Sequence, residues 1–557
     1  MTHRAVNVTD KNDTQWQAIN WRQANRVVKN LRQRIFKATR EGRWKTVRNL
    51  QRLLMKSLSN IYLAVRRCTQ QNQGKKTPGV DGLVVLNPKG RGVLVDALKK
   101  FIPWKPLPTK RVYIPKPNGK KRPLGIPTLI DRCLQAIVLN ALEPCWEAQF
   151  ERASYGFRPG RCTHDAAEKI FNAVRPNKKK KWVVDADIKG CFDNINHEFL
   201  IGRIGNFPAR KLIQQWLKAG YVDKNVFHES ETGTPQGGII SPLLANIALH
   251  GMEKALGVIY EKSGGSRGKR IVVRYADDFV ILCETQEDAN KAKDEIIHWL
   301  LERGLSLSEE KTRIVHMTEG FDFLGWNFRH YKVSDRKSGY KLLIKPSAKS
   351  IKNIRDKLRQ IWLSNRGKEI GAVITELTPV VRGWANYHRK MVASEVFHEL
   401  DKWMFDRAKK YAKQRHPNKS DKWRNQRYFG RFNYDREDNW VFGDHQTGAH
   451  VPKFSWFHIE RHTLIPGDYS PDNPDPDVQG WFRKNRAKQA KDYNKSWQKI
   501  AKRQNHVCPR CGDSLFNGEN IHKHHSTPKA IGGKDTYSNY QLVHLMCHQQ
   551  IHHEKTQ

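Results

Sequence analysis

Two stretches of the sequence place acidic residues among apolar, β-branched ones. Asp187 lies near the end of Lys181 to Ile188 (KWVVDADI), and Asp277-Asp278 interrupts Arg270 to Cys283 (RIVVRYADDFVILC). This pattern predicts core strands, with the paired acids in a tight turn between strands 271–275 and 279–282. Burying an unpaired carboxylate is unfavourable unless a cation neutralises it, so the pattern favours a divalent metal site. An isolated Asp-Asp pair is more often an ordinary turn, and only the surrounding sequence can decide.

Soft metal ligands are grouped near the C-terminus. Cys508 and Cys511 form a Cys-x-x-Cys pair, and His544 and Cys547 repeat the same spacing further along the chain. Four such ligands in two close pairs are typical of a structural, tetrahedral Zn²⁺ site. His522 is an alternative to His544 as the fourth ligand. A unit this small at the end of the chain is expected to need the metal in order to fold.

The charge balance points to nucleic acid. The 557 residues include 100 Lys and Arg against 55 Asp and Glu, a net charge of +45, which excludes an ordinary metabolic enzyme. Each Lys or Arg that neutralises a phosphate adds affinity for a polyanion. No apolar run approaches the roughly 18 residues of a membrane span, and the first residues match neither a signal nor a transit peptide. Nine cysteines are too few for a disulfide scaffold. We expect a cytoplasmic protein without membrane association.

The remaining sequence divides into segments that must position these residues. Residues 14–70 have apolar residues at helical spacing among Arg and Lys, and strands alternate with helices from about residue 110. After Lys345-Pro346 the pattern is helical again. Lys402 to Arg427 holds ten Lys and Arg against two acids, and Pro471 to Asp477 reads as a linker. The fold class is therefore α+β with several domains.

Eight sequence blocks, in order, resemble the reverse transcriptases encoded by group II introns, also called maturases. The blocks are KTPGVDG (76–82), RVYIPKPNGKKRPLGIP (111–127), SYGFRPGR (154–161), DADIKGCFDNI (185–195), GTPQGGIISPLLANIAL (233–249), RYADDFVI (274–281), GLSLSEEKT (304–312) and FDFLGW (321–326). The C-terminal run of His524-His525, Asn539, His548 and His552 resembles the HNH endonucleases. Together the two resemblances cover nearly the whole chain.

The resemblance implies a right-hand polymerase with five regions. The first, 1–108, is a helical extension that includes the start of the fingers, and 109–345 holds fingers and palm with an antiparallel sheet. Residues 346–440 would be a helical thumb and maturase domain, 441–504 a linker with a basic DNA-binding region, and 505–557 a zinc-stabilised ββα-metal nuclease domain. Aromatic residues of the thumb could stack on RNA bases, although any single Trp is more often core.

The resemblance also implies roles for residues of the polymerase. Asp187 and Asp277 would hold two Mg²⁺ ions, with help from Asp278 and the backbone carbonyl of Ile188. Such a metal pair suits phosphoryl transfer, because it activates the attacking hydroxyl and stabilises the leaving pyrophosphate. Lys116 and Arg122 would grip the triphosphate, and Phe192 would exclude a 2′-hydroxyl. Gln236 would touch the template-primer, and Lys311 would lie near the pyrophosphate.

In the nuclease domain, the resemblance makes His525 the general base and Asn539 the residue that orients the attacking water. His524, His548 and His552 would hold one catalytic cation, expected to be Mg²⁺, against the scissile phosphate. His548 and His552 are four residues apart, which places them on one helix face. A histidine-rich tail that merely collects metal, or a nuclease fold kept only for DNA binding, are the alternatives.

The predicted function is RNA-directed DNA polymerase, splicing-assisting maturase and DNA-nicking endonuclease in one bacterial protein. Its partners would be group II intron RNA in a ribonucleoprotein, target double-stranded DNA, an RNA template with a DNA primer, and dNTPs. The main alternative is a non-enzymatic splicing factor on the same fold. An RNA-templated polymerase with a diversity-generating or defence role and an RNA-dependent RNA polymerase are further alternatives.

Overall fold

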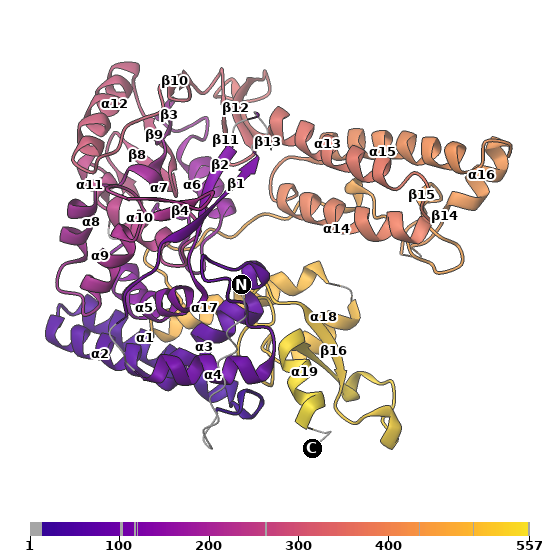
Figure 1. Cartoon of the computed structure of the whole chain (residues 1–557). Coiled ribbons are helices and arrows are strands. Elements are labelled where there is room, and N and C mark those ends of the chain that lie inside the picture. The colour runs from indigo at the N-terminus through magenta and orange to yellow at the C-terminus, as the bar shows by residue number, and fades with distance from the viewer. Residues whose placement is uncertain are drawn as a thin grey trace.

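The computed structural model describes residues 14–100, 104–115, 119, 121–261, 265–433, 435–493 and 495–554. Its N-terminal layer consists of helices α1 (Trp21–Arg40), α2 (Trp44–Lys56), α3 (Leu58–Arg66) and α4 (Pro88–Lys99) (Figure 1). Each helix buries an apolar face, including Ile35 and Leu54, and most of the basic residues lie outside it, although Arg66 and Arg91 are buried. The layer packs on α5 (Leu129–Glu147), most of whose residues are buried.

The fingers hold a four-stranded sheet in the order β2-β1-β4-β5. Its strands are β1 (Thr109–Pro115), β2 (Lys121–Ile126), β4 (Tyr221–Asp223) and β5 (Val226–His228). β1 pairs antiparallel with β2 and parallel with β4. Most side chains of β1 are exposed, so this sheet offers an open surface beside the palm.

The palm sheet carries the predicted carboxylates. Its order is β10 (Arg313–His316), β3 (Trp182–Asp187), β9 (Asp278–Cys283) and β8 (Ile271–Tyr275), with every pair antiparallel. Val183 packs on the side of α6 (Thr163–Ala173) and Val184 on the side of α12 (Gln286–Leu301). Because helices cover both faces of the sheet, the strand sequences are largely continuous apolar runs. The predicted strands and their hairpin are confirmed.

Shorter elements surround these sheets. They are η1 (Trp16–Ala18), α7 (Cys191–Asn194), α8 (His197–Ile204), α9 (Arg210–Lys218), α10 (Ser241–Ala248), α11 (Met252–Ala255), β6 (Ile259–Tyr260) and β7 (Ser266–Arg267). A three-stranded sheet, β11 (Phe321–Phe323), β12 (Trp326–Lys332) and β13 (Tyr340–Pro346), joins the palm to the thumb. Among the described residues, the structure contains no helix both long and apolar enough for a membrane span.

The thumb is a group of helices that projects from the palm (Figure 1). It comprises α13 (Ala348–Ser364), α14 (Ile370–His388), α15 (Ser394–Arg415) and α16 (Asp421–Tyr428). A small hairpin follows, in which β14 (Phe429–Gly430) pairs with β15 (Val441–Phe442). Phe442, Val451 and Phe454 belong to the thumb core. The thumb therefore continues past residue 440, where the sequence predicted its end.

The segment predicted as a linker is anchored to the body. No helix or strand is assigned to residues 471–475, but Asp472 is buried, and both of its carboxylate oxygens accept hydrogen bonds from Arg32 at 2.8 and 2.6 Å. Arg32 also donates to Glu143 of α5. Helix α17 (Pro476–Gln489) starts directly afterwards, with Asp475 as its N-cap. The Arg32 guanidinium thus fixes this segment between the palm and the nuclease domain.

The C-terminal domain has the predicted ββα arrangement. Strands β16 (Ile521–His525) and β17 (Tyr540–His544) pair antiparallel and are followed by α19 (Leu545–Glu554). Helix α18 (Lys495–Arg503) belongs to the same unit, because Gln504 exchanges hydrogen bonds with the backbone of Leu542. The domain does not stand on its own core: it shares one with Trp16, Trp21 and other residues of the N-terminal layer. Figure 1 shows α19 beside α3 and α4.

Candidate active sites

The three acids of the palm meet at one end of the sheet. Asp187 and Asp278 are direct partners across the β3–β9 ladder, and Asp277 precedes Asp278 in the turn. Burial raises the pKa of Asp277. Burial, together with Asp277 and Asp187, raises the pKa of Asp278 to about 7. Carboxylates that repel one another in this way are stabilised when a cation binds beside them. The set of oxygen donors suits Mg²⁺.

A buried arginine fixes the turn that carries these acids. Arg274 is 2% exposed and donates to Asn246 Oδ1 at 3.0 Å, Ser154 Oγ at 2.7 Å and the Ala276 carbonyl at 3.1 Å. Ala276 has a φ of 61°, in the left-handed region. A Cβ at Gly156 would lie 2.3 Å from the Ala276 nitrogen, so only glycine lets the 154–161 loop support the turn. The sequence did not reveal this role of Arg274.

Two of the predicted substrate-binding residues lie against the acids. The Lys311 ammonium contacts Asp187, and this hydrogen bond raises the pKa of Lys311. Arg122 lies on β2, and its positive charge acts on Asp277. Ile188 is buried after β3, where its backbone bridges Leu307. Lys116 lies outside the described residues.

Phe192 directly precedes Asp193 in α7, and Gln236 contacts the Asp193 side chain. The Phe192 ring packs edge-on against Phe157, with centroids 6.1 Å apart, and Phe157 is half exposed. Gln236 Nε2 donates to Asp193 Oδ2 at 3.3 Å, while its carbonyl accepts from Gly125 of β2 at 2.7 Å. The turn around Gln236 thus links fingers to palm beside the acids.

The structure gathers Cys508, Cys511, His544 and Cys547, whose ligand atoms lie within 4.8 Å of one another. All four residues are buried. His544 Nε2 lies 3.0 Å from the Ser514 carbonyl, which leaves Nδ1 facing Cys511 Sγ at 3.4 Å. His522 pairs with Val543 on the sheet and is not in this cluster. The three thiols and one imidazole fit a tetrahedral Zn²⁺.

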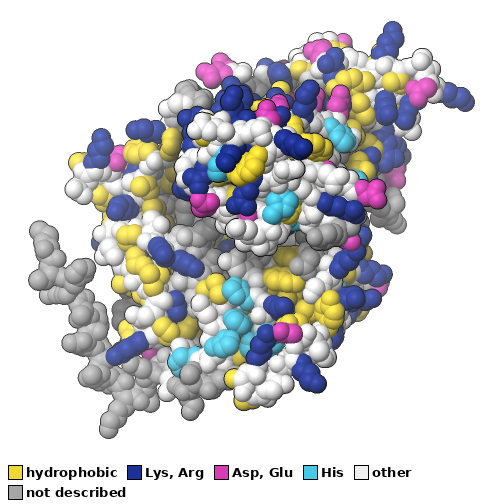
Figure 2. Space-filling view, turned by 90° about the vertical axis from the view of Figure 1, so that its right-hand side faces the viewer, with side chains coloured by type: hydrophobic (Ala, Val, Ile, Leu, Met, Phe, Trp, Pro, Cys, Tyr) yellow, Lys and Arg dark blue, Asp and Glu magenta, His cyan; other side chains and the backbone are white. Residues whose placement is uncertain are grey.

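A second cluster in the same domain consists of His524, His548 and His552, with ligand atoms again within 4.8 Å. His525 Nε2 is bonded to Asp535 Oδ1 at 2.8 Å, and the Tyr540 hydroxyl donates to the same oxygen at 2.7 Å. Asp535 was missed because it lies in a loop with no recognisable spacing to His525. Figure 2 shows histidines (cyan) gathered on the lower lobe, where the nuclease domain lies.

Asn539 is held by three hydrogen bonds to backbone atoms. Its Oδ1 accepts from the Thr527 amide at 2.7 Å, and its Nδ2 donates to the carbonyls of Thr527 and Lys534 at 2.9 and 3.0 Å. All of these partners are backbone atoms of the loop after β16. The side chain therefore closes the loop that presents Asp535, and its contact with an attacking water stays a prediction.

The thumb aromatics are mostly core, as expected for single residues. Tyr411 is buried, and Tyr387 stacks on Trp326 with centroids 4.4 Å apart. Trp384 packs on Phe397 and Phe454. Basic residues remain outside: Figure 2 shows Lys and Arg (dark blue) spread over the thumb. Among the aromatic residues that the structure describes in this region, Trp440 is exposed, and the sequence patterns did not single it out.

Models of four protein families match consecutive parts of the chain. Residues 16–98 match the N-terminal domain of reverse transcriptase, and 114–328 match reverse transcriptase (RNA-dependent DNA polymerase). Residues 351–429 match the group II intron, maturase-specific domain, and 508–554 match HNH endonuclease. Together the four regions include the palm acids, the thumb helices and both nuclease clusters.

Individual relatives extend this similarity. Protein YkfC of Escherichia coli (strain K12) is 36% identical over 313 residues, covering 50% of this chain and 82% of that protein. Group II intron-encoded protein LtrA of Lactococcus lactis subsp. cremoris is 32% identical over 400 residues, covering 59% of this chain and 65% of LtrA, just under two thirds of it. Maturase-like protein 1 of Euglena gracilis is 28% identical over 380 residues, covering 66% and 76%. The chain therefore belongs to the group II intron-encoded reverse transcriptases with a maturase domain, and it ends in an HNH endonuclease domain.

Proposed function

We propose that the chain is an RNA-directed DNA polymerase, a maturase and a DNA endonuclease, with the palm as its polymerising site. The observation that carries the polymerase is the convergence of Asp187, Asp277 and Asp278 from two distant segments. Burial disfavours their charges, and a bound cation would reverse that cost. A protein that only clamped RNA would have no physical reason to keep this arrangement.

In this proposal, Asp187, Asp277, Asp278 and the carbonyl of Ile188 hold two Mg²⁺ ions. Bound metal would lower the pKa of the primer 3′-hydroxyl and neutralise charge on the phosphates. Lys311, within contact of Asp187, is placed to receive negative charge on the departing pyrophosphate. Lys116 and Arg122 would grip the triphosphate. Phe192 would fill the space of a 2′-hydroxyl, and Gln236 would contact the template-primer.

In the nuclease domain, His525 would accept a proton from the attacking water, with Asp535 orienting its ring. His524, His548 and His552 would hold one Mg²⁺, which supplies positive charge to the scissile phosphate. Cys508, Cys511, His544 and Cys547 would hold Zn²⁺ as a structural ion. Asn539 would act by closing the loop that carries Asp535.

The order of events would join these activities. The chain would bind its intron RNA through the basic thumb, assist splicing and remain bound as a ribonucleoprotein. It would then nick one strand of target DNA and extend the new 3′ end with dNTPs on the RNA template. LtrA is named as a group II intron-encoded protein of a bacterium, and we propose a bacterial cytoplasm as the setting here too.

Primer extension on an RNA template tests the polymerase. The wild type should incorporate dNTPs in Mg²⁺, and Asp277→Ala should abolish extension, while Asp335→Ala, which removes an exposed acid between β12 and β13, should leave it intact. Phe192→Val should admit ribonucleotides. If the wild type binds structured RNA but makes no DNA, the splicing-factor alternative stands instead.

A nicking assay tests the nuclease independently. His525→Ala should abolish cleavage of one strand of the target duplex and leave primer extension at the wild-type rate. Asp277→Ala should abolish primer extension and leave cleavage of the target duplex at the wild-type rate. If both variants lost both activities, the two sites would not be the separate centres proposed here.

A further inference from the structure

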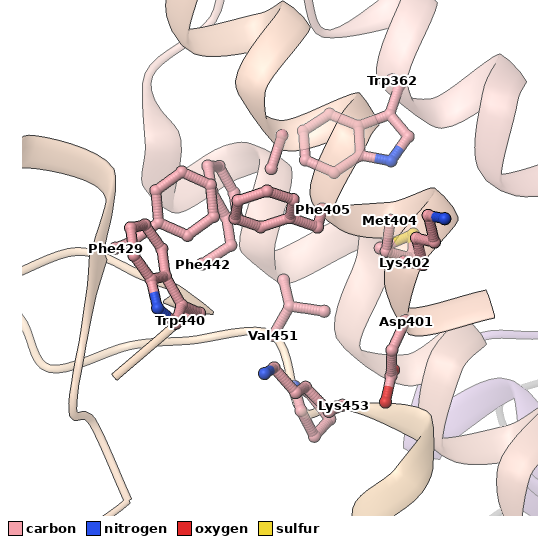
Figure 3. Close-up of a pocket in the computed structure, with 12 residues that line it drawn as sticks. Trp362, Asp401, Lys402, Met404, Phe405, Phe429, Trp440, Phe442, Val451 and Lys453 are labelled. Atoms are coloured by element: carbon pink, nitrogen blue, oxygen red, sulfur yellow. The ribbon is translucent and has the colours of Figure 1, made fainter. Parts of the chain in front are cut away.

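The thumb contains an aromatic cavity of about 340 Å³ beside the β14–β15 hairpin (Figure 3). Trp362 of α13 forms one wall, Phe405 of α15 the middle, and Phe429 with Trp440 the opposite wall. Phe442 of β15 lies behind them. The wall therefore combines residues that are far apart in sequence, and the cavity exists only when the hairpin packs on the helices.

The cavity is accessible, although aromatic residues usually fill a core. Trp440 is 52% exposed, and it meets Phe405 edge-on at 5.7 Å and Phe429 at 6.0 Å. Edge contacts of this kind leave ring faces free for a further flat group. An exposed tryptophan over an apolar cavity is an unfavourable surface unless something covers it.

One wall carries a polar atom that lacks a partner. Trp362 is 4% exposed, and its indole N–H has no acceptor among the described residues. Figure 3 shows this nitrogen turned toward Met404 and Lys402, which also line the cavity. Both are long, flexible side chains that can move aside. Buried donors are normally satisfied, so a hydrogen-bond acceptor is missing here.

The charges around the cavity favour an anionic chain. Lys402 and Lys453 lie on its lining, and Asp438 pairs with Lys453 at 2.8 Å. Residues 403–427 add nine Lys and Arg against two acids along the adjoining helices. The only carboxylate of the lining is Asp401, which accepts hydrogen bonds from the backbone of Phe454 and Ser455. Its oxygens are thus turned to the protein.

We propose that this cavity takes one unpaired nucleobase of the bound RNA. The proposal rests on the proposed function, because it names an RNA contact of the maturase domain. A base offers a π face to the exposed Trp440, which lies perpendicular to Phe405. It also offers ring acceptors to the Trp362 N–H and a neighbouring phosphate to Lys402. An apolar peptide would fill the cavity but would bring no anionic group to Lys402.

A double-mutant cycle tests the proposal with the full chain. The probes are a single-stranded oligoadenylate RNA and an abasic RNA of equal length, and the dissociation constant of each is measured by fluorescence anisotropy at one salt concentration. Stacking of one base is worth about 5- to 150-fold in affinity. We expect Trp440→Ala to weaken binding of oligoadenylate by a factor in that range while leaving abasic RNA unaffected.

Two further variants separate stacking from hydrogen bonding and from general damage. Trp362→Phe keeps an aromatic wall and removes the N–H, so it should weaken only the base-containing RNA, by a smaller factor than Trp440→Ala. Leu363→Ala changes an exposed neighbour on the same helix and should change neither probe. The far-UV circular dichroism spectra of all three variants should match that of the wild type, which shows that the chain remains folded.

The outcomes distinguish a failure of the base site from a failure of RNA binding. If Trp440→Ala weakens both probes equally, or neither, the cavity is not a base site and this proposal is wrong while RNA binding stands. If the wild type binds neither probe, the proposed RNA-binding function itself fails. If oligoadenylate and abasic RNA bind the wild type equally, no base is captured anywhere and the cavity proposal fails.

Discussion

At the scale of single residues, the chemistry depends on side chains that touch no substrate. Asp277 is placed by Arg274, and His525 by Asp535. Neither supporting residue belongs to a recognisable spacing, because their partners come from other parts of the chain. The acids and histidines could be predicted from sequence, since metal-binding and base chemistry restrict the residue types. Their supports could not, because many polar residues could have supplied the same hydrogen bonds.

Replacing Arg274 with glutamine should abolish polymerisation without altering any carboxylate. The buried guanidinium of Arg274 donates to Asn246, Ser154 and the Ala276 carbonyl. Leaving a buried acceptor without its donor costs about 1–3 kcal/mol, so the free energy of unfolding should fall by at least that order. Chemical denaturation and primer extension measure both effects. Arg267→Gln, at an exposed position of β7, is the control and should change neither.

Replacing Asp535 with asparagine should slow DNA nicking by about 10- to 100-fold, the usual effect of losing a residue that orients a site histidine. Hydrogen bonds from Lys529, His525 and Tyr540 lower the pKa of Asp535, so it is an anion at neutral pH. Lys529→Met removes another partner and leaves the His525 contact. Nicking by Lys529→Met should therefore stay close to wild type, and equal losses in both variants would contradict the orienting role. Primer extension should be unchanged.

At the scale of elements, the observed strands agree closely with the predicted ones wherever a single apolar pattern runs through the whole segment. The β3 and β8–β9 strands match their β-branched runs. The end of the thumb could not be predicted from the sequence, because β14 and β15 are only two residues long and their pairing joins positions separated by a loop. Short hairpins of this kind carry too little pattern to be recognised, yet this one builds the wall of the aromatic cavity.

The junction of palm and thumb should weaken in acid. Burial lowers the pKa of His164 to about 4 and that of His388 to about 3, from an ordinary 6.5. A lowered pKa means that the unfolded chain takes up protons first, so the stabilisation is complete above about pH 6.5 and is lost as the pH falls toward 4. At pH 5 the loss should be on the order of 1–2 kcal/mol for each histidine.

Thermal unfolding at pH 7 and pH 5 measures this loss. His388→Gln should flatten the pH dependence, because a neutral amide can keep the hydrogen bond to Ser350 Oγ without taking up a proton. His298→Gln, on the exposed side of α12, should leave it as in the wild type. A pH dependence that His388→Gln does not reduce would place the acid sensitivity elsewhere.

At the scale of the whole molecule, the nuclease domain is built onto the opposite end of the chain. Asn25 donates to the Cys511 carbonyl at 2.9 Å, and Gln550 donates to the Ile19 carbonyl at 3.2 Å. Arg66 of α3 is buried over the ring of Trp21 and contacts both Glu519 and Cys547 Sγ. No periodicity in the sequence encodes such docking, which is why the nuclease was expected to be an independent unit held by its metal alone.

Arg66 should therefore govern how firmly Zn²⁺ is held. Burial alone would lower the pKa of Arg66, but the neighbouring Cys547, Glu519 and Cys511 raise it, so the guanidinium stays charged. Three thiolates and one neutral imidazole around Zn²⁺ carry a net negative charge, which this cation offsets. Arg66→Gln should weaken zinc retention by about 10- to 100-fold, as loss of an outer partner of a metal ligand does. Zinc content after dialysis against graded chelator measures the change.

The same variant should loosen the N-terminal layer, because the nuclease domain covers Trp16 and Trp21. Complete removal of zinc should therefore expose α1 and α3 as well as residues 505–554 to limited proteolysis, with the palm and thumb fragments still protected. Arg67→Gln, which changes the exposed neighbouring arginine, should retain zinc and protection like the wild type. If chelation freed the nuclease domain while the N-terminal helices stayed fully protected, the shared core would contribute nothing to their stability, and zinc would be a local support of the nuclease alone.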